Sequence, residues 1–334
     1  MPSSQSRAAM VPISRRVRAY FAPVDRASGT PAIFDPAKFG AFPLESAPAP
    51  WLDLGWIDNF ERVSLTPIEA LRSGLRGAPA AQARGILDAR IELDFREWGK
   101  LQMALAGGSE HMNVLAADPN APPHPSGGTP IASIPVLAGS TADEILVGAV
   151  AVGSFSAGDI VAVDADYASQ TGYVGAGISG AYVTNPADVS NDANYIRRAT
   201  FNVARVAQLT AVSLLLAQPL LAGAPSAGWG VQKIVAFVDR EGGSFLQEWS
   251  ALFIAEDDSG GRVCFHYPRL SPTSSARSAS NSGFVRERPS EIAAPIAALS
   301  LHAAFIAMPY TDDNDTQTVL CYRSYFPSPM ADLY

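Results

Sequence analysis

Cysteine and histidine are scarce in this chain of 334 residues. With only two cysteines, Cys264 and Cys321, a disulfide framework and any Cys-x-x-Cys metal site are excluded. Both cysteines lie in strand-like runs, where we expect buried, reduced thiols. The four histidines show no His-x-His or His-x-x-x-His spacing, so no metal site can form from neighbours in sequence.

Charge is also sparse: charged residues make up 17% of the chain, against about 25% in typical soluble domains. The formal net charge is −8. This balance argues against wrapping nucleic acid by phosphate neutralisation, which needs clustered Lys and Arg. So little charge also indicates that part of the surface is covered in the working form.

Long unbroken apolar runs are missing. The two most apolar stretches, 203–224 and 291–310, are interrupted by Pro219 and Pro295 and by polar side chains. Because a spanning helix needs about 20 predominantly apolar residues, we expect no membrane span. Residues 1–18 lack the apolar core of a signal peptide, so we expect an intracellular product.

What is present is mostly β-type pattern. Residues 87–94 alternate strictly between apolar and charged, which predicts a strand with one buried face. A helix is predicted directly after it, because Asp94 and Glu97 have capping-box spacing and Gly107-Gly108 provides an end.

Further strands are predicted along the rest of the chain, with a proline- and glycine-rich linker at 118–130. A hairpin turn is predicted at 256–261, and a final hairpin pairs residues 299–308 with 318–325. The other predicted strands are 145–152, 159–163, 195–206, 231–238, 245–254 and 262–267.

The motifs that could carry chemistry are weak. Gly175–Gly180 matches Gly-x-Gly-x-x-Gly, but no helix start follows it, as a dinucleotide site requires. Asp164 and Asp166 could act as an acid–base pair or bind Ca²⁺, although a solvated strand end is the simpler interpretation. We therefore predict no catalytic residue, no cofactor and no metal.

Three arginines lie in the serine-rich segment 271–290, which we interpret as a long loop. A solvated loop is the simplest interpretation of Arg277, Arg286 and Arg288. The sharper hypothesis is that they contact an acidic neighbouring subunit, and they are our candidate contact residues between stacked rings.

The residues also carry a family resemblance. Residues 53–60, Asp-Leu-Gly-Trp-Ile-Asp-Asn-Phe, followed by the strand and helix pattern of 85–107, resemble the tail tube proteins of long-tailed bacteriophages. Residues 251–269 and 299–310 are similar to the last hairpins of that family. The middle of the chain departs from the family pattern and is interpreted as an insertion that decorates the tube exterior.

The resemblance implies a mainly β fold: a tail-tube-type β-sandwich or barrel with one short helix flanking the sheet, plus an inserted β-rich domain. Residues 1–125 would form an N-terminal arm and the first half of the tube domain, and residues 126–225 the insertion. Residues 226–334 would form the second half, with the 271–290 loop and a C-terminal arm.

The resemblance also implies a function, that of a structural, non-enzymatic virion protein. Hexameric rings would stack into a tube that meets terminator, tape measure and baseplate or distal tail proteins. DNA would pass through the lumen without specific binding, and an acidic lining would repel its phosphates. The protein would be assembled in the bacterial host cytoplasm and reside in the virion tail.

The sequence is also compatible with other interpretations. The sequence does not separate contractile from non-contractile tails, or a phage from an injection system or gene-transfer particle. A different class is a β-sandwich module of a virion that binds glycan or decorates the capsid, for which Trp51 and Trp56 would have to form an aromatic platform. The third is a nucleotide-dependent enzyme using Gly175–Gly180.

Overall fold

The structure of the protein is a computed structural model. The residues that it describes are 16–24, 29–65, 68–73, 78–84, 88–108, 111–116, 118, 120, 131–164, 201–239, 247–258, 260–273 and 300–328. The chain divides into two compact units. The first comprises Met1–Ala22, Pro31–Trp98 and Glu248–Tyr334, and the second comprises Pro23–Thr30 and Gly99–Gln247.

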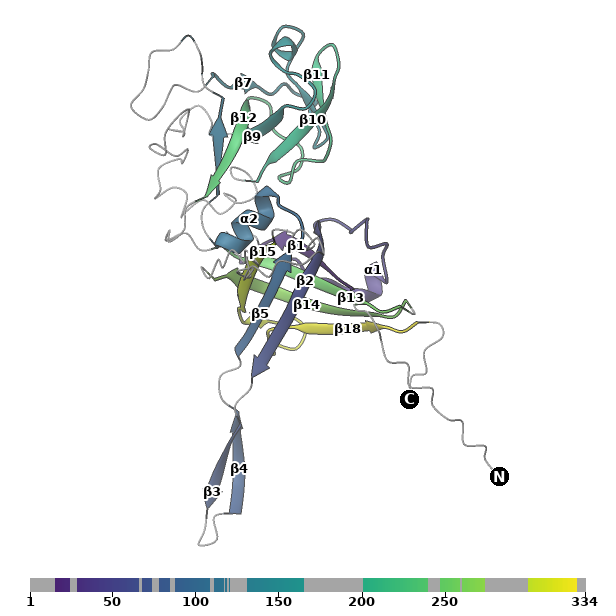
Figure 1. The fold of residues 1–334 in the computed structure, drawn as a ribbon, viewed down its shortest axis with the longest axis vertical. Coiled ribbons are helices and arrows are strands. Elements are labelled where there is room, and N and C mark those ends of the chain that lie inside the picture. Colours follow the sequence, from purple (N-terminus) through teal and green to yellow (C-terminus); the bar gives the residue numbers. More distant parts are fainter. Residues whose placement is uncertain are drawn as a thin grey trace, which may run out of the picture. The chain divides into compact units, whose positions relative to one another are not determined.

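A closed antiparallel β-barrel of six strands forms the first unit (Figure 1). The strands follow each other in the order β13-β1-β2-β5-β15-β14, and the pairing of β13 with β14 closes the sheet. A seventh strand, β18, pairs with the first half of β14. The bounds are β1 Arg16–Pro23, β2 Leu52–Leu65, β5 Asp88–Phe95, β13 Trp249–Glu256, β14 Arg262–Pro272, β15 Leu301–Ala307 and β18 Tyr322–Phe326.

Aromatic side chains fill this barrel. The rings of Phe21 and Phe305 lie 5.5 Å apart although β1 and β15 are not neighbours in the sheet, so the contact crosses the interior. Phe253 contacts Phe21 at 5.8 Å and Phe60 at 4.9 Å. Small barrels have interiors that side chains can fill completely, which explains how six strands form a solid core.

The other face of β1, β13 and β14 is covered by the segment that connects β1 to β2. This segment contains the short helix α1 (Pro36–Phe39), capped by the Asp35 carboxylate, which accepts a hydrogen bond from the Ala37 N–H at 2.8 Å. The segment packs a second apolar cluster against the strands. Its buried members are Tyr20, Ala22, Phe34, Phe42, Leu44, Trp51, Leu252, Ile254 and Cys264.

β2 and β5 form a long hairpin that continues beyond the barrel ladder. Their pairing reaches Leu65 opposite Asp88, and the chain between them forms a second ladder, β3 (Ile68–Ser73) with β4 (Ala78–Arg84). A bulge at Asn59, whose φ is +51°, shifts the β2–β5 register between Asp58 and Glu61. Figure 1 shows the two ladders following one another along the same chain reversal.

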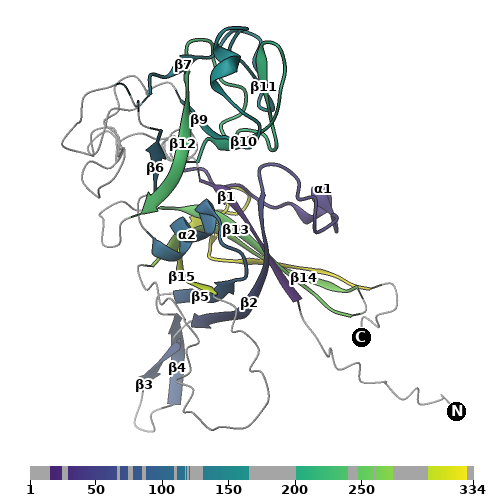
Figure 2. The same ribbon diagram turned by 45° about the horizontal axis from the view of Figure 1, so that its top comes forward.

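The second unit is built on another antiparallel sheet of seven strands, in the order β6-β12-β9-β10-β11-β8, with β7 also on β12. Figure 2 shows the long β12 beside β6 and β9. The predicted insertion, 126–225, lies inside this unit, whose bounds are wider because α2, β6 and β12 belong to it. Its elements are α2 Lys100–Gly107, β6 His111–Leu115, β7 Ile134–Pro135, β8 Glu144–Leu146, a 3₁₀ turn at Ala151–Ser154, β9 Ile160–Asp164, β10 Val203–Leu209, β11 Ser213–Leu216 and β12 Gly230–Asp239.

The fold class is therefore mainly β with few, short helices, as the sequence predicts. The alternating strand is confirmed as β5, in which Ala89, Ile91 and Leu93 are buried. The predicted turn at 256–261 is confirmed by the pairing of β13 with β14.

The predicted helix start is wrong. Phe95 belongs to β5, fully buried and paired with Ile57 on one side and Leu301 on the other, so strand pairing overrides the local capping pattern. The helix begins at Lys100, after a Gly99 N-cap that makes no side-chain bond, and lies against β12. Its predicted end is confirmed by Gly108, which has φ +60° and donates to the Ala104 carbonyl.

Two other predicted elements differ from the structure. The run 145–152 is split into β8 and a 3₁₀ turn. The final hairpin does not pair 299–308 with 318–325, because β15 pairs with β5 and β14 while β18 pairs with β14. A small ladder of β16 (Tyr310–Thr311) with β17 (Thr318–Val319) lies between them instead.

We expect Phe253→Ala to lower the free energy of unfolding by about 3–5 kcal/mol, because it removes a fully buried ring and leaves a cavity among three aromatic neighbours. Leu65→Ala, at a position that is 62% exposed, should change it by less than about 0.5 kcal/mol. Chemical denaturation followed by tryptophan fluorescence measures both. Equal effects of the two substitutions would contradict the assigned barrel core.

Candidate self-association surface

Several residues singled out by sequence lie outside the described residues. They include the candidate contact arginines Arg277, Arg286 and Arg288, and the glycine motif Gly175–Gly180. Asp166 and His124 also lie there, while Asp164 is buried at the end of β9. Of the cysteines, Cys264 is buried as expected, whereas Cys321 is only half-buried, and both are free thiols.

The two tryptophans do not form an exposed platform. Trp51 is buried with its ring edge-on to His266, at 5.6 Å between ring centroids. Trp56 lies half-buried under the Arg18 guanidinium, 5.2 Å from its ring centre. A glycan-binding module built on this pair is therefore not supported by their positions.

His266 is a packed core histidine. Its side chain is 1% exposed, and its Nε2 donates to the Ala32 carbonyl at 3.1 Å. Burial lowers the pKa of His266 to about 4, because the protonated ring would have to lose its hydration. The imidazole is therefore neutral at physiological pH and fixes the segment before α1 to β14.

His302 belongs to a polar chain on β2, β5 and β15. Its Nδ1 lies 2.8 Å from Asp94 Oδ1, and the side-chain amide of Asn59 donates to Asp94 Oδ2 at 2.5 Å. Within the described part of the chain, no hydroxyl or thiol bonds to the other nitrogen of His302. Among the described residues, His302 and Asp94 are arranged like the base and the orienting carboxylate of a catalytic triad but have no nucleophile beside them, and with Asn59 they satisfy the polar groups at the β2 bulge.

Lys100 is the one lysine with an unusual environment. It donates to the Asn113 side-chain carbonyl, and its ammonium group lies 5.1 Å from the ring centre of Phe201 and 4.8 Å from that of Phe237. Burial lowers the pKa of Lys100 well below its usual range. Sequence reasoning missed this site, whose contacts join the first turn of α2 to β6 and β12.

No group of three or more metal-ligating side chains is found over the described ranges. Among those residues, none of the helices has the length and apolar content needed to cross a bilayer.

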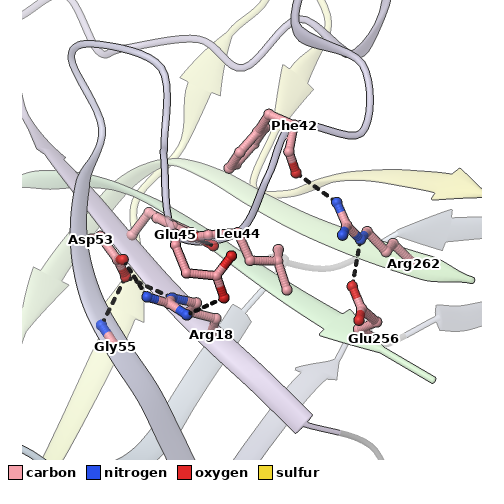
Figure 3. Close-up of polar contacts among 9 residues, drawn as sticks. Arg18, Phe42, Leu44, Glu45, Asp53, Gly55, Glu256 and Arg262 are labelled. Atoms are coloured by element: carbon pink, nitrogen blue, oxygen red, sulfur yellow. Dashed lines mark hydrogen bonds and ion pairs between the residues drawn. The ribbon is translucent and has the colours of Figure 1, made fainter. Parts of the chain in front are cut away.

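Charge pairs fasten the α1 segment to the barrel (Figure 3). The Arg18 guanidinium donates to both Asp53 oxygens at 2.9 and 2.6 Å and reaches Glu45 at 3.1 Å. Arg262 bridges Glu256 and the Phe42 carbonyl, each at 2.6 Å. The bidentate bond of Arg18 to Asp53 defines its geometry well, and both Arg18 and Arg262 are paired with acids of the same unit.

The outward face of the β2–β5 hairpin is different, because its acids outnumber its cations. A shallow groove of about 290 Å³ runs along it, which we call the β2–β5 groove. Its exposed apolar side chains are Val63 and Leu65, 54% and 62% exposed. The lining residues are Glu61, Val63, Leu65, Asp88, Arg90 and Glu92.

Within the β2–β5 groove, Glu61 lies directly opposite Glu92 in the ladder. Arg90 pairs with Asp88 at 3.4 Å, and neither glutamate forms an ion pair with any described residue. Like charges directly opposite one another destabilise a strand pair. Sequence reasoning could find the alternating face of 88–94, but the facing glutamates depend on the bulge at Asn59, which carried no recognised signal.

Exposed apolar side chains rimmed by polar ones are a feature of surfaces that meet other proteins. No family model matches the sequence, and a search among curated proteins found no match. The function is therefore inferred from the geometry of the first unit.

The free energy of unfolding should fall as the pH drops from about 6.5 to about 4, because His266 becomes protonated in the unfolded chain before it does in the folded chain. The unfolded chain binds this proton near pH 6.5 and the folded chain only near pH 4, so the free energy of unfolding decreases by about 3 kcal/mol across that window. His266→Gln keeps a donor for the Ala32 carbonyl and should flatten this part of the profile. Denaturation between pH 4 and 7.5 measures both proteins, and identical slopes would be the contrary result.

Proposed function

We propose that the chain is a structural, non-enzymatic subunit of a tail tube or of the related inner tube of a phage-tail-like particle. Copies form hexameric rings that stack around a channel through which DNA passes into the host. The proposal extends the resemblance to the tail tube proteins of long-tailed bacteriophages. The observation that carries it is the long β2–β5 hairpin with its exposed, unmatched outer face.

The hairpin favours association for an energetic reason. An isolated two-stranded hairpin is at best marginally stable in water, and β3 and β4 form such a ladder. Burying Val63 and Leu65 against another copy would remove apolar surface from water at a gain of about 25 cal/mol per Å². The β3–β4 ladder and the exposed apolar side chains both lower the stability of a monomer, and contact with another copy would stabilise both.

The barrel interior also favours a channel between copies. Phe21, Phe253 and Phe305 meet across it, so one subunit has no lumen of its own. A passage for duplex DNA therefore requires the outer surfaces of several subunits. Several subunits that close into a ring, with their strands forming its wall, would provide such a passage.

The charge of the chain suits DNA transit. A net charge of −8 would repel phosphates, so that DNA slides without binding specifically. In this proposal no cofactor or metal takes part. The partners are further copies and the terminator, tape measure and baseplate or distal tail proteins, met in the virion tail after assembly in the bacterial host cytoplasm.

A second candidate is a β-sandwich module of a virion that binds glycan or decorates the capsid. It would require an exposed ligand surface, and the positions of Trp51 and Trp56 do not provide one. It remains the alternative outcome of the following experiment.

Negative-stain electron microscopy of the purified full chain at rising concentration tests the proposal. We expect six-fold rings or hollow tubes with a pore wide enough for duplex DNA, since the exposed hairpin faces are buried only by association. A monodisperse monomer at every concentration would contradict the tube and direct attention to glycan arrays.

A shortened hairpin should separate folding from assembly. Replacing residues 66–87 by Asn-Gly connects Leu65 to Asp88, which already face each other, through a two-residue turn. We expect the barrel to fold with a cooperative unfolding transition, while the concentration needed for assembly, read by analytical ultracentrifugation, rises at least about tenfold. Unaltered assembly would mean that β3 and β4 take no part in it.

A further inference from the structure

The β2–β5 groove has an excess of negative charge that nothing in the described chain neutralises. The groove is lined by three acids, among them the facing pair Glu61 and Glu92, and by one arginine. Next to this pair, Val63 and Leu65 are more than half exposed. The best occupant of such a groove is a group with a cation and an apolar or aromatic surface.

The first unit also carries an excess of positive charge, on the face of β2 opposite the groove. Arg62 points away from the groove: its Nε donates to the Tyr267 hydroxyl at 2.9 Å and its guanidinium lies 4.9 Å from the Phe265 ring centre. No carboxylate of the described residues pairs with it. Its neighbours are a phenol, an aromatic ring and the Cys321 thiol.

Arg323, on β18, adds a second cation at this place. The guanidinium groups of Arg62 and Arg323 both act to lower the pKa of the Cys321 thiol, although burial raises it overall. Arg323 is exposed, and in the described chain it forms no ion pair. Tyr325, two residues further along the same face of β18, is 55% exposed.

We propose that Arg323 and Tyr325 of one copy dock in the β2–β5 groove of the next copy. The inference rests on the proposed self-assembling function and assigns the surfaces through which copies meet. The arginine would neutralise the facing Glu61 and Glu92, and the tyrosine ring would cover Val63 and Leu65. Arg and Tyr are the residue types enriched at the energetic centres of protein interfaces.

The geometry of this contact has a consequence for assembly. The groove and the β18 face are different surfaces of one subunit, so copies can join head-to-tail, each offering its groove to one neighbour and its β18 face to the other, which is a heterologous contact. Heterologous contacts generate closed rings when the rotation closes and open filaments when it does not. The proposed head-to-tail pairing therefore suits a ring or stack, and a closed dimer in which two copies exchange both contacts would overturn it.

Charge reversal tests the contact, using the full chain. Glu61→Lys with Glu92→Lys makes the groove positive, and Arg323→Glu makes the β18 face negative. All three positions are exposed, so the barrel should remain folded. Asp258→Lys and Arg16→Glu are matched controls, since each reverses one exposed charge elsewhere in the unit.

We expect each reversal alone to raise the concentration needed for assembly at least about tenfold, and the controls to leave it unchanged. A chain carrying all three substitutions should regain assembly. An equimolar mixture of the two reversed proteins should also assemble, because opposite charges then alternate around an even-numbered ring. Sedimentation and negative-stain images provide the readouts.

The outcomes distinguish the inference from the function on which it rests. If the unsubstituted chain assembles and the reversals change nothing, or the combined chain fails to regain assembly, the docking proposal is overturned and the proposed function stands. If the unsubstituted chain never assembles, both are overturned. Should a reversed protein not fold, Glu61→Gln with Glu92→Gln and Arg323→Gln provide the same test with smaller expected shifts of about threefold to fivefold.

Discussion

Closure of the first sheet, in which β13 pairs with both β1 and β14, is the constraint on which the rest of this unit depends. Closure brings Phe21 and Phe305 together from strands that are not neighbours, and the interior of a small barrel can be filled by such rings. It also removes sheet edges that would otherwise be open to unwanted pairing. The exposed outer faces are then the surfaces left for association.

The two faces of β2 illustrate how one strand can serve core and surface together. On one face Phe60 and Arg62 lie among the barrel aromatics, and on the other Glu61 and Val63 line the groove. The bulge at Asn59 sets this arrangement, because it shifts the register so that Glu61 faces Glu92. Repulsion between the two carboxylates is tolerated in the monomer, which is consistent with a groove that acts in an assembly.

Prediction from sequence succeeded where the signal is local. The alternation of 87–94 could only be a strand, and Gly108 ends the helix because it adopts a left-handed conformation that other residues avoid. It failed where a distant partner decides. Asp94 and Glu97 look like a capping box, yet Phe95 pairs with Leu301 some 200 positions away in sequence, as a part of β5. Of the β2–β5 groove, the sequence predicted only the alternating charged face.

By itself, the sequence determined that the chain is mainly β, without a disulfide framework, sparse in charge and acidic, because composition and a period of two are properties of the residues alone. Only the tertiary structure decided which strands are neighbours, that Trp51 and His266 are buried together, and that Glu61 faces Glu92 while Arg62 does not. The physical reason is that a strand's pattern specifies which face is apolar but not which strand it meets. That choice depends on contacts such as β1 with β13, between segments more than 200 residues apart.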